Sequence, residues 1–335
     1  MAMRYVGSRA LLGALLALVL LVSPAGARVA PGDPPPPAAE GGRIAAAFAK
    51  LSRDTSWQLV RKVPLKFNAY HPEGIVRLGD RYVLSAVEVI EPTQKYQPPG
   101  TIIDGTDRTP GKGIGHLLAF DNEGNLLADR HVAEADSTIY HPGGLDYDGR
   151  DLWLAVAEYR PNKPSIIYRV DPESLVPHEV LRSPDHIGGI VHNTRRHRIL
   201  GLNWGSRKAY EWKLTGHGAV VTATVTNPSY FVDYQDCKYL GRPRAFKHPA
   251  MLCSGIATLH HVGPDGQPAN YDLGGVAEVD VTTMRPLDEV PLQEYTDQRQ
   301  VATRNALDVQ VVNGHLRLYL VADDNQSNLL IYEAR

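Results

Sequence analysis

The chain has 335 residues, of which 43% are hydrophobic and 21% charged, and its formal net charge is −2. The apolar content is sufficient for a folded core. The balanced charge excludes an extended basic surface for nucleic acid or anionic membranes. The length fits one large or two ordinary domains, and closed all-β folds often use this length as one domain.

Residues 1–27 have the form of a secretory signal peptide. Two arginines precede an apolar run over residues 10–22, and small residues end the segment at Ala27. A positively charged start, a short hydrophobic region and a small-residue cleavage site mark such a peptide. We therefore predict a secreted, extracellular protein cleaved near Ala27, with no integral membrane association after cleavage. An uncleaved N-terminal anchor is the alternative.

Three segments precede the main domain. Residues 28–42 contain five prolines, and they are predicted to form an extended linker outside the core. In residues 43–56, apolar side chains recur at helical spacing among alanines, which predicts a short amphipathic helix. Residues 57–66 alternate partly between apolar and polar side chains and are predicted to form a strand.

Five short segments of similar sequence head five repeats, and they are residues 70–75, 140–145, 185–190, 234–239 and 304–309. Each is followed by further apolar runs, but the last repeat ends at Arg335, one strand short. The strand at 57–66 is one strand extra, and it can complete the last repeat so that no sheet edge is exposed. We predict an all-β fold in residues 57–335, a single β-propeller domain of five four-stranded blades closed by the N-terminal strand. Six blades remain possible if an insertion hides a degenerate unit.

Cys237 and Cys253 are the only cysteines and lie 16 residues apart on neighbouring predicted strands. Export to an oxidising compartment permits a bridge between them, and we predict a disulfide. The alternative is two buried free thiols.

In a four-stranded blade, the start of the innermost strand and the end of the second strand lie at the same mouth of the central channel. The inner strands bring His71, His141, His186, Gln235 and Asn305 to this mouth, and the second strands bring Glu88, Glu158, Asn203 and Asp323 or Asp324. Insertions at 91–114 and 257–273 rise over the same face. Loops on a rigid scaffold are the usual place for a binding site.

The residue types at this mouth suggest two kinds of chemistry. Histidine with carboxylate suits a divalent transition metal, whereas an all-oxygen set would favour calcium. The metal candidates are His71, His141, His186, Asn203, Asp323 and Asp324. Gathered carboxylates can instead act as general acid and base, and the catalytic candidates are Glu73, Glu88 and Glu158. The alternative for each histidine is a structural hydrogen bond to a neighbouring blade.

The positions where the repeats differ are the better functional candidates. Glu73 stands where the second and third repeats have glycine, so the repeat does not require it. The scaffold likewise gives no reason for Gln235, Asp236 or Asn305, and these are candidate ligand-binding residues. Trp204 follows a second strand and could stack on a ring of a ligand, although a core role is the simpler interpretation.

The segment His71-Pro72-Glu73-Gly74-Ile75, together with residues 321–324 and 328–333, resembles the gluconolactonase and regucalcin-like propellers. This resemblance implies that Glu73 is a metal ligand, Asn203 an Asn ligand, and Asp323 or Asp324 the acidic partner of a divalent ion, usually calcium. As a whole, the chain resembles a family of secreted bacterial propeller proteins, a resemblance that implies no activity.

The sequence thus predicts a secreted, monomeric propeller that binds a small polar molecule or carbohydrate at a channel mouth lined by histidine and carboxylate. One divalent metal ion of open identity is the expected cofactor, and no nucleic acid partner is expected. If the protein is an enzyme, the expected reaction is hydrolysis of a lactone, ester or glycosidic bond. The alternative is a non-catalytic binding or interaction module whose channel histidines are structural.

Overall fold

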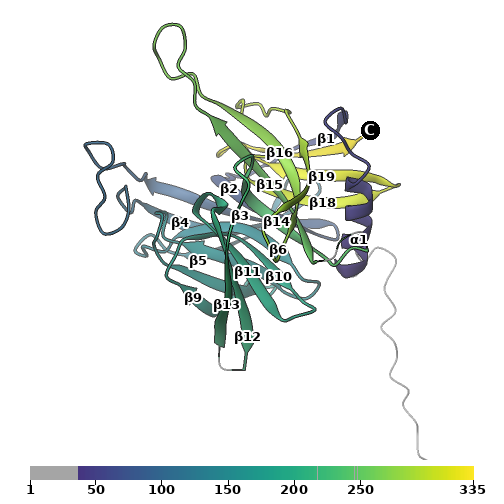
Figure 1. Ribbon diagram of the computed structural model, residues 1–335, viewed down its shortest axis with the longest axis horizontal. Coiled ribbons are helices and arrows are strands. Elements are labelled where there is room, and N and C mark those ends of the chain that lie inside the picture. The colour runs from purple at the N-terminus through teal and green to yellow at the C-terminus, as the bar shows by residue number, and fades with distance from the viewer. Residues whose placement is uncertain (1–36, 217, 245, 247) are drawn as a thin grey trace, which may run out of the picture. The chain divides into compact units, whose positions relative to one another are not determined.

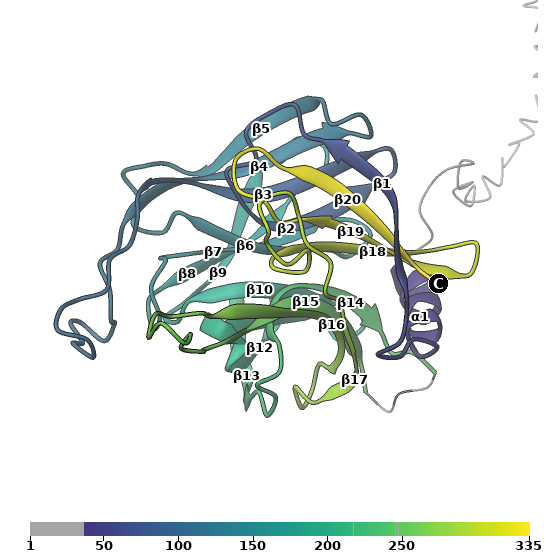
Figure 2. The ribbon, with the colours of Figure 1, turned by 90° about the horizontal axis from the view of Figure 1, so that it is seen from above.

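The computed structural model describes residues 37–335 except 217, 245 and 247. The predicted signal peptide and the first part of the predicted linker lie outside the described residues. Residues 37–335 belong to one compact unit, in which five antiparallel four-stranded sheets surround a central channel (Figure 1, Figure 2). The predicted five-bladed propeller is confirmed, and neither insertion hides a sixth blade.

The first four blades run in chain order from the channel outward. Blade I contains β2 (His71–Leu78), β3 (Arg81–Glu91), β4 (Lys112–Asp121) and β5 (Leu126–Ala133). Blade II contains β6 (His141–Tyr147), β7 (Leu152–Ala157), β8 (Ser165–Val170) and β9 (Pro177–Ser183). Blade III contains β10 (Ile187–Asn193), β11 (Arg198–Asn203), β12 (Lys208–Thr215) and β13 (Gly218–Thr226), with the short helix η1 (Trp204–Ser206) after β11. Blade IV contains β14 (Asp233–Gly241), β15 (Ala250–Leu259), β16 (Tyr271–Asp280) and β17 (Pro286–Pro291).

Blade V joins the two ends of the domain. It contains β18 (Ala306–Val312), β19 (His315–Val321), β20 (Asn328–Ala334) and, as its outermost strand, β1 (Trp57–Pro64). The pairing of β1 with β20 is antiparallel and extends from Trp57 opposite Ala334 to Pro64 opposite Asn328 (Figure 2). This is the predicted closure, in which hydrogen bonds between distant parts of the chain hold the ring together.

The helix α1 (Pro37–Phe48) starts and ends earlier than the predicted helix at 43–56, and it includes the last residues of the predicted linker. Ile44 and Phe48 are buried in one cluster with Leu240, near the end of inner strand β14, and Val309, in the middle of inner strand β18. Two physical reasons explain the shift. Proline fits the first turn of a helix, and Gly41 is needed where α1 approaches the carbonyl oxygen of Leu240, because a Cβ there would lie 2.2 Å from that oxygen. The helix packs at the channel end opposite the mouth.

The inner strands approach one another backbone to backbone. In the first four blades, the register of the inner strand against the second strand breaks near its start, as at a β-bulge. A Cβ on Gly74 would lie 2.5 Å from the amide nitrogen of Leu145, and one on Gly143 would lie 1.9 Å from the carbonyl oxygen of Gly188. Glycine recurs in the repeat because no side chain fits between these strands.

The same contacts correct the alignment of the fourth and fifth repeats. The hydroxyl of Ser85 donates to the carbonyl oxygens of Gly74 and Gly143, and the hydroxyl of Ser254 donates to those of Asp236 and Asn305. Asn305 is therefore equivalent to Gly143, two residues after the histidine position. Gln235, which precedes Asp236, is likewise equivalent to Glu73, which precedes Gly74. The sequence alignment had placed Gln235 and Asn305 with the histidines; Asp233, opposite Ile256 as His71 is opposite Val87, occupies that place in blade IV.

The predicted disulfide is present. Cys237 of β14 lies directly opposite Cys253 of β15, the two sulfur atoms are bonded, and both residues are fully buried. The bridge ties the inner strand of blade IV to the second strand, immediately after the bulge that carries Gln235 and Asp236.

The glycine contacts predict a difference between two equivalent positions. Gly143→Ala should lower the free energy of unfolding by about 2 kcal/mol or more, because its methyl group would overlap the backbone of blade III. Chemical denaturation of the purified protein measures this change.

Gly188→Ala is the matched control, because the nearest atom to its Cβ would be Nε2 of His186 at an ordinary contact distance of 3.5 Å. Its unfolding free energy should stay within about 0.5 kcal/mol of the wild type. Equal stability of the two variants would contradict the proposed role of Gly143.

Candidate functional site

A cavity of about 260 Å³ opens at the start of the inner strands. Its lining includes eight of the residues predicted from the sequence, namely His71, Glu73, His141, His186, Asn203, Trp204, Gln235 and Asn305. At two of the five equivalent bulge positions the cavity is lined by a glycine, Gly143 or Gly188. Side chains project from the other three, which are Glu73, Gln235 and Asn305.

Glu73 and two histidines form the centre of this cavity. Oε1 of Glu73 lies 3.0 Å from Nε2 of His71 and 3.4 Å from Nε2 of His141. His71 uses its other nitrogen, Nδ1, to contact Oδ1 of Asp324 at 2.8 Å. The side chains of His71, Glu73 and His141 each offer one donor atom within 4.8 Å of the others, a spacing that could hold a metal ion.

The third predicted histidine is fixed by the scaffold. Nδ1 of His186 lies 2.9 Å from the carbonyl oxygen of Glu158 and donates to it, so the lone pair is on Nε2. The edge of its ring meets the face of Trp204, with 4.8 Å between ring centroids. His186 therefore has a structural partner and also presents a free nitrogen close to the cavity.

Aromatic rings form one wall of the cavity. The ring of Tyr159 stacks on His141 with 4.1 Å between centroids, and it lies 5.2 Å from Trp204. The guanidinium group of Arg108, from the insertion between β3 and β4, lies 4.6 Å from the Trp204 ring centroid. This insertion thus contacts a cavity-lining residue, but none of its own residues is among those that line the cavity. The hairpin extension of β15 and β16 contributes only Ile256 at its base (Figure 1).

Burial and ion pairing give the three histidines different charge states. Burial lowers the pKa of His71, but hydrogen bonds to Asp324 and Glu73 outweigh it and raise this pKa to about 9. Burial acts to raise the pKa of Glu73, but His141 and His71 outweigh it and lower this pKa. Burial lowers the pKa of His141 to about 4 and also lowers that of His186. At neutral pH, His71 is charged and the other two histidines are neutral.

Arg304 and Tyr159 are lining residues that the sequence analysis missed. Nη1 of Arg304 is buried and has no hydrogen-bond partner among the described residues; the nearest carboxylate oxygen, Oδ1 of Asp324, is 3.8 Å away. Both residues could have been found from their positions in the repeats, because Arg304 directly precedes the candidate residue Asn305 and Tyr159 directly follows the candidate residue Glu158. The amide of Asn305 donates to the carbonyl oxygen of Pro72 at 2.5 Å, whereas the side chain of Gln235 makes no hydrogen bond to the described part of the chain.

Two of the three predicted catalytic carboxylates lie outside the cavity. Glu88 lines a separate cavity of about 270 Å³ beside blade I, together with Tyr70, His71 and Asp324. Glu158 is buried in an ion pair with Arg160. The expectation that Glu73, Glu88 and Glu158 share one cavity is therefore wrong, because the second strands end behind the aromatic and histidine side chains rather than among them.

The predicted metal ligands from the second strands also have other partners. Asp323 accepts a hydrogen bond from the hydroxyl of Thr296, and Asp324 contacts Nδ1 of His71 and lies 3.8 Å from Nη1 of Arg304. Asn203 lines the cavity, but its amide donates to Asp185 and its carbonyl oxygen accepts from the backbone nitrogen of Lys208. Contacts within the protein therefore occupy the side chains of all three residues.

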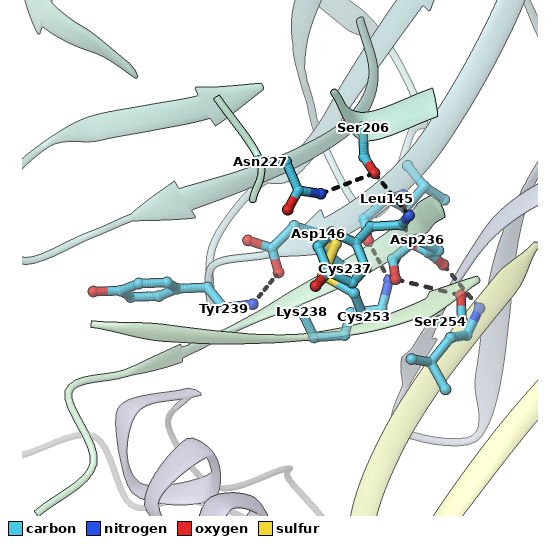
Figure 3. The surroundings of a disulfide bond; sticks show 12 residues. Leu145, Asp146, Ser206, Asn227, Asp236, Cys237, Lys238, Tyr239, Cys253 and Ser254 are labelled. Carbon is cyan, nitrogen blue, oxygen red and sulfur yellow. Dashed lines mark hydrogen bonds and ion pairs between the residues drawn. A yellow bond between two sulfur atoms is a disulfide. The ribbon is translucent and has the colours of Figure 1, made fainter. Parts of the chain in front are cut away.

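Asp236 lies in the channel, is fully buried and joins four strands (Figure 3). Its Oδ2 accepts hydrogen bonds from the backbone nitrogens of Ile75 and Leu307, each at 2.9 Å. Its Oδ1 accepts from the backbone nitrogen of Leu145 at 3.0 Å and from Nζ of Lys238 at 2.9 Å. All four partners are donors, so the geometry requires the ionised carboxylate. Asp236 is a structural residue, and the prediction that it binds ligand is replaced by this role.

Asp236 should therefore be essential for stability. Asp236→Asn places an amide group among backbone donors and leaves Lys238 without its buried counter-ion, so the free energy of unfolding should fall by about 3–5 kcal/mol. Denaturant unfolding measures it, with the exposed turn residue change Asp80→Asn as control. An unchanged midpoint for Asp236→Asn would refute the assignment.

The pKa of His71 predicts a pH dependence of stability. Its folded value of about 9 lies above the ordinary value of 6.5, so its ion pairs contribute fully below pH 6.5 and are lost as the pH rises through 9. The stability difference between the wild type and His71→Gln should shrink over this range. His178→Gln, at an exposed histidine of β9, should show no such trend, and a constant difference for His71→Gln would contradict the assigned pKa.

Within the described residues, no helix is long and apolar enough to cross a membrane.

The sequence has no significant match among curated proteins. Among solved structures, it is similar to a luciferin-regenerating enzyme (11% identity, 84% of this chain and 95% of that chain covered, TM-score 0.43). It is also similar to MPT-4, a mannose phosphorylase from Leishmania mexicana, in complex with phosphate ion (10% identity, 86% and 91% covered, TM-score 0.44). These similarities assign no activity to this chain. A family model matches residues 36–335, and the chain therefore belongs to the family of unknown function DUF6454.

Proposed function

We propose that the mouth cavity binds a small polar ligand with the help of one divalent metal ion held by His71, Glu73 and His141. The observation that carries this proposal is the convergence of two imidazoles and one carboxylate, with donor atoms within 4.8 Å of one another, in a cavity of about 260 Å³. The equivalent positions of blades II and III are glycines, so the ring does not need the Glu73 carboxylate for closure.

The donor set fits a divalent transition metal. Two nitrogen atoms and one carboxylate oxygen suit zinc, manganese, iron or nickel rather than calcium, which prefers oxygen ligands. His141 is neutral and can donate its lone pair directly, whereas His71 must first lose the Nε2 proton that faces Glu73, while its Nδ1 proton stays on the side of Asp324. A metal ion bound there would lower the pKa of a coordinated water and polarise a substrate carbonyl.

The remaining lining indicates the class of ligand. Nη1 of Arg304 has no hydrogen-bond partner among the described residues, and it suits an anionic or carbonyl oxygen. The side chain of Gln235 is free to donate and accept, and Trp204 and Tyr159 provide ring faces against which a sugar ring can pack. A carbohydrate or small hydroxy acid derivative combines these features. The buried disulfide is compatible with an extracellular protein, and we propose a secreted monomer.

Hydrolysis of a lactone or ester is the enzymatic reaction that fits best. A glycosidase requires two carboxyl groups facing the same bond, and of the three candidate glutamates only Glu73 lines the cavity. A metal-activated water needs only the ligand set and a group such as Arg304 to stabilise developing negative charge on oxygen. The second candidate function is a non-catalytic binding module, and the hydrogen bond from His186 to Glu158 favours it for that histidine.

The metal content tests the proposal directly. Untagged protein, stripped with chelator and titrated with zinc by calorimetry, should bind one equivalent in the cavity. Glu73→Gln and His71→Gln should each remove this equivalent or weaken its affinity at least about tenfold. Zinc-loaded wild type, but not these variants, should hydrolyse small lactone or ester substrates.

Glu91→Gln is the matched control, because Glu91 is an exposed glutamate of the same blade that pairs only with Lys112. It should bind zinc as the wild type does. Identical zinc binding by Glu73→Gln and Glu91→Gln would overturn the metal site. Zinc binding without hydrolysis would leave the binding module as the function.

A further inference from the structure

We propose a second metal site on the outer strands of blade I, formed by His116 of β4 and by Asp129 and His131 of β5. Their side chains each offer one donor atom, and these atoms lie within 4.8 Å of one another. None of the three lines the channel cavity. This proposal is independent of the function proposed for the channel.

The strand register brings the three side chains to one face of the blade. His116 lies directly opposite His131 in the antiparallel pair, and Asp129 lies opposite Leu118, two residues further along β4. Because side chains alternate between the faces of a strand, residues two apart share a face. Leu118 of this face packs in the apolar layer between blades I and V, and the polar group continues that face toward the mouth end of the strands.

The propeller scaffold does not require a histidine at position 116. In blade I, Ala86 of the second strand pairs with Pro72 on one side and with His116 on the other. In blade II, Val156 pairs in the same way with Pro142 and with Ile166. An isoleucine thus occupies the position equivalent to His116, and an apolar side chain satisfies the packing there.

His116 is buried and incompletely satisfied. It is 1% exposed, and its Nε2 has no hydrogen-bond partner in the described part of the chain. Its Nδ1 lies 2.8 Å from Oδ1 of Asp129, and the ring of Tyr70 stacks on it with 4.4 Å between centroids. A buried polar group without a partner costs about 1–3 kcal/mol, so packing alone does not favour a histidine at this position.

Each histidine has a carboxylate next to the ring nitrogen that faces away from the cluster. Oε2 of Glu88 is 3.6 Å from Nε2 of His116, and Oε1 of Glu134 is 3.1 Å from Nδ1 of His131. Histidines that bind metal commonly donate their second ring N–H to a carboxylate, which fixes the ring and strengthens the ligand. Glu134 takes this position beside His131, whereas Glu88, at 3.6 Å, is too far from Nε2 of His116 for a hydrogen bond.

The donor set selects a divalent transition metal, with zinc as the first candidate. Two imidazoles and one carboxylate supply three protein ligands, and water can complete a tetrahedral site. The side chains of Asp129 and His131 are 32% and 41% exposed, so an ion can reach them from solvent. A bound ion would tie the exposed outer strand β5 to the buried strand β4.

Zinc titration of metal-stripped, untagged full-length protein tests the site. His131→Ala and Asp129→Asn should each remove one zinc equivalent or weaken its affinity at least about tenfold. Both side chains are exposed, so both variants should fold, and thermal unfolding without zinc verifies this. Glu73→Gln, which acts in the channel, should leave this equivalent in place, so the failure of either site is recognised separately.

His178→Ala is the matched control, because His178 is an exposed histidine on β9, the equivalent outer strand of blade II. It should bind zinc as the wild type does. Unchanged zinc stoichiometry and affinity in both His131→Ala and Asp129→Asn would overturn the proposal. An equal loss in His178→Ala would also overturn it, since zinc would then bind exposed histidines without a built site.

Discussion

The close approach of the inner strands around the channel is the constraint on which the rest of the structure depends. At their bulges the strands contact one another through backbone atoms, and Gly74 and Gly143 are required because no side chain fits there. The backbone nitrogens turned into the channel at this level need an acceptor, and the carboxylate of Asp236 accepts from blades I, II and V at once. One buried charge thus connects the inner strands of four blades.

The cavity follows from the places where this ring is irregular. Five equivalent positions face the mouth; two are glycines without a side chain, and Glu73, Gln235 and Asn305 line the cavity with theirs. The side chains behind them hold the geometry. Asp324 positions His71 from blade V, and the carbonyl oxygen of Glu158 positions His186. The result is one charged histidine beside a carboxylate and two neutral histidines, although all three histidines occupy the same position in their repeats, because each has different partners.

Blade I supplies all of the outer cluster and, with His71 and Glu73, two of the three residues of the channel cluster, whose third member, His141, comes from blade II. Tyr70 stacks on His116, while the side chain of its neighbour His71 lies in the channel. Tyr70 and His71 both also line the separate cavity of about 270 Å³ that Glu88 lines. The two clusters have different relations to the fold. The residues of the channel cluster occupy positions of the repeat that face the mouth in every blade. The outer cluster replaces apolar packing at one position of one blade, and nothing in the closure of the ring depends on it.

Much of the architecture could be predicted from the sequence, because strand alternation, the recurring His-Pro-x-Gly segment and the spare first strand are local patterns that repeat. The five blades, their closure by residues 57–64 and the Cys237–Cys253 bridge follow from them. Only the tertiary structure decided the alignment of Gln235 and Asn305 with Glu73, the structural role of Asp236 and the separation of Glu88 and Glu158 from the cavity. Those outcomes depend on which backbone atoms of neighbouring blades meet, and these contacts join residues as much as 233 positions apart, beyond the reach of any local pattern.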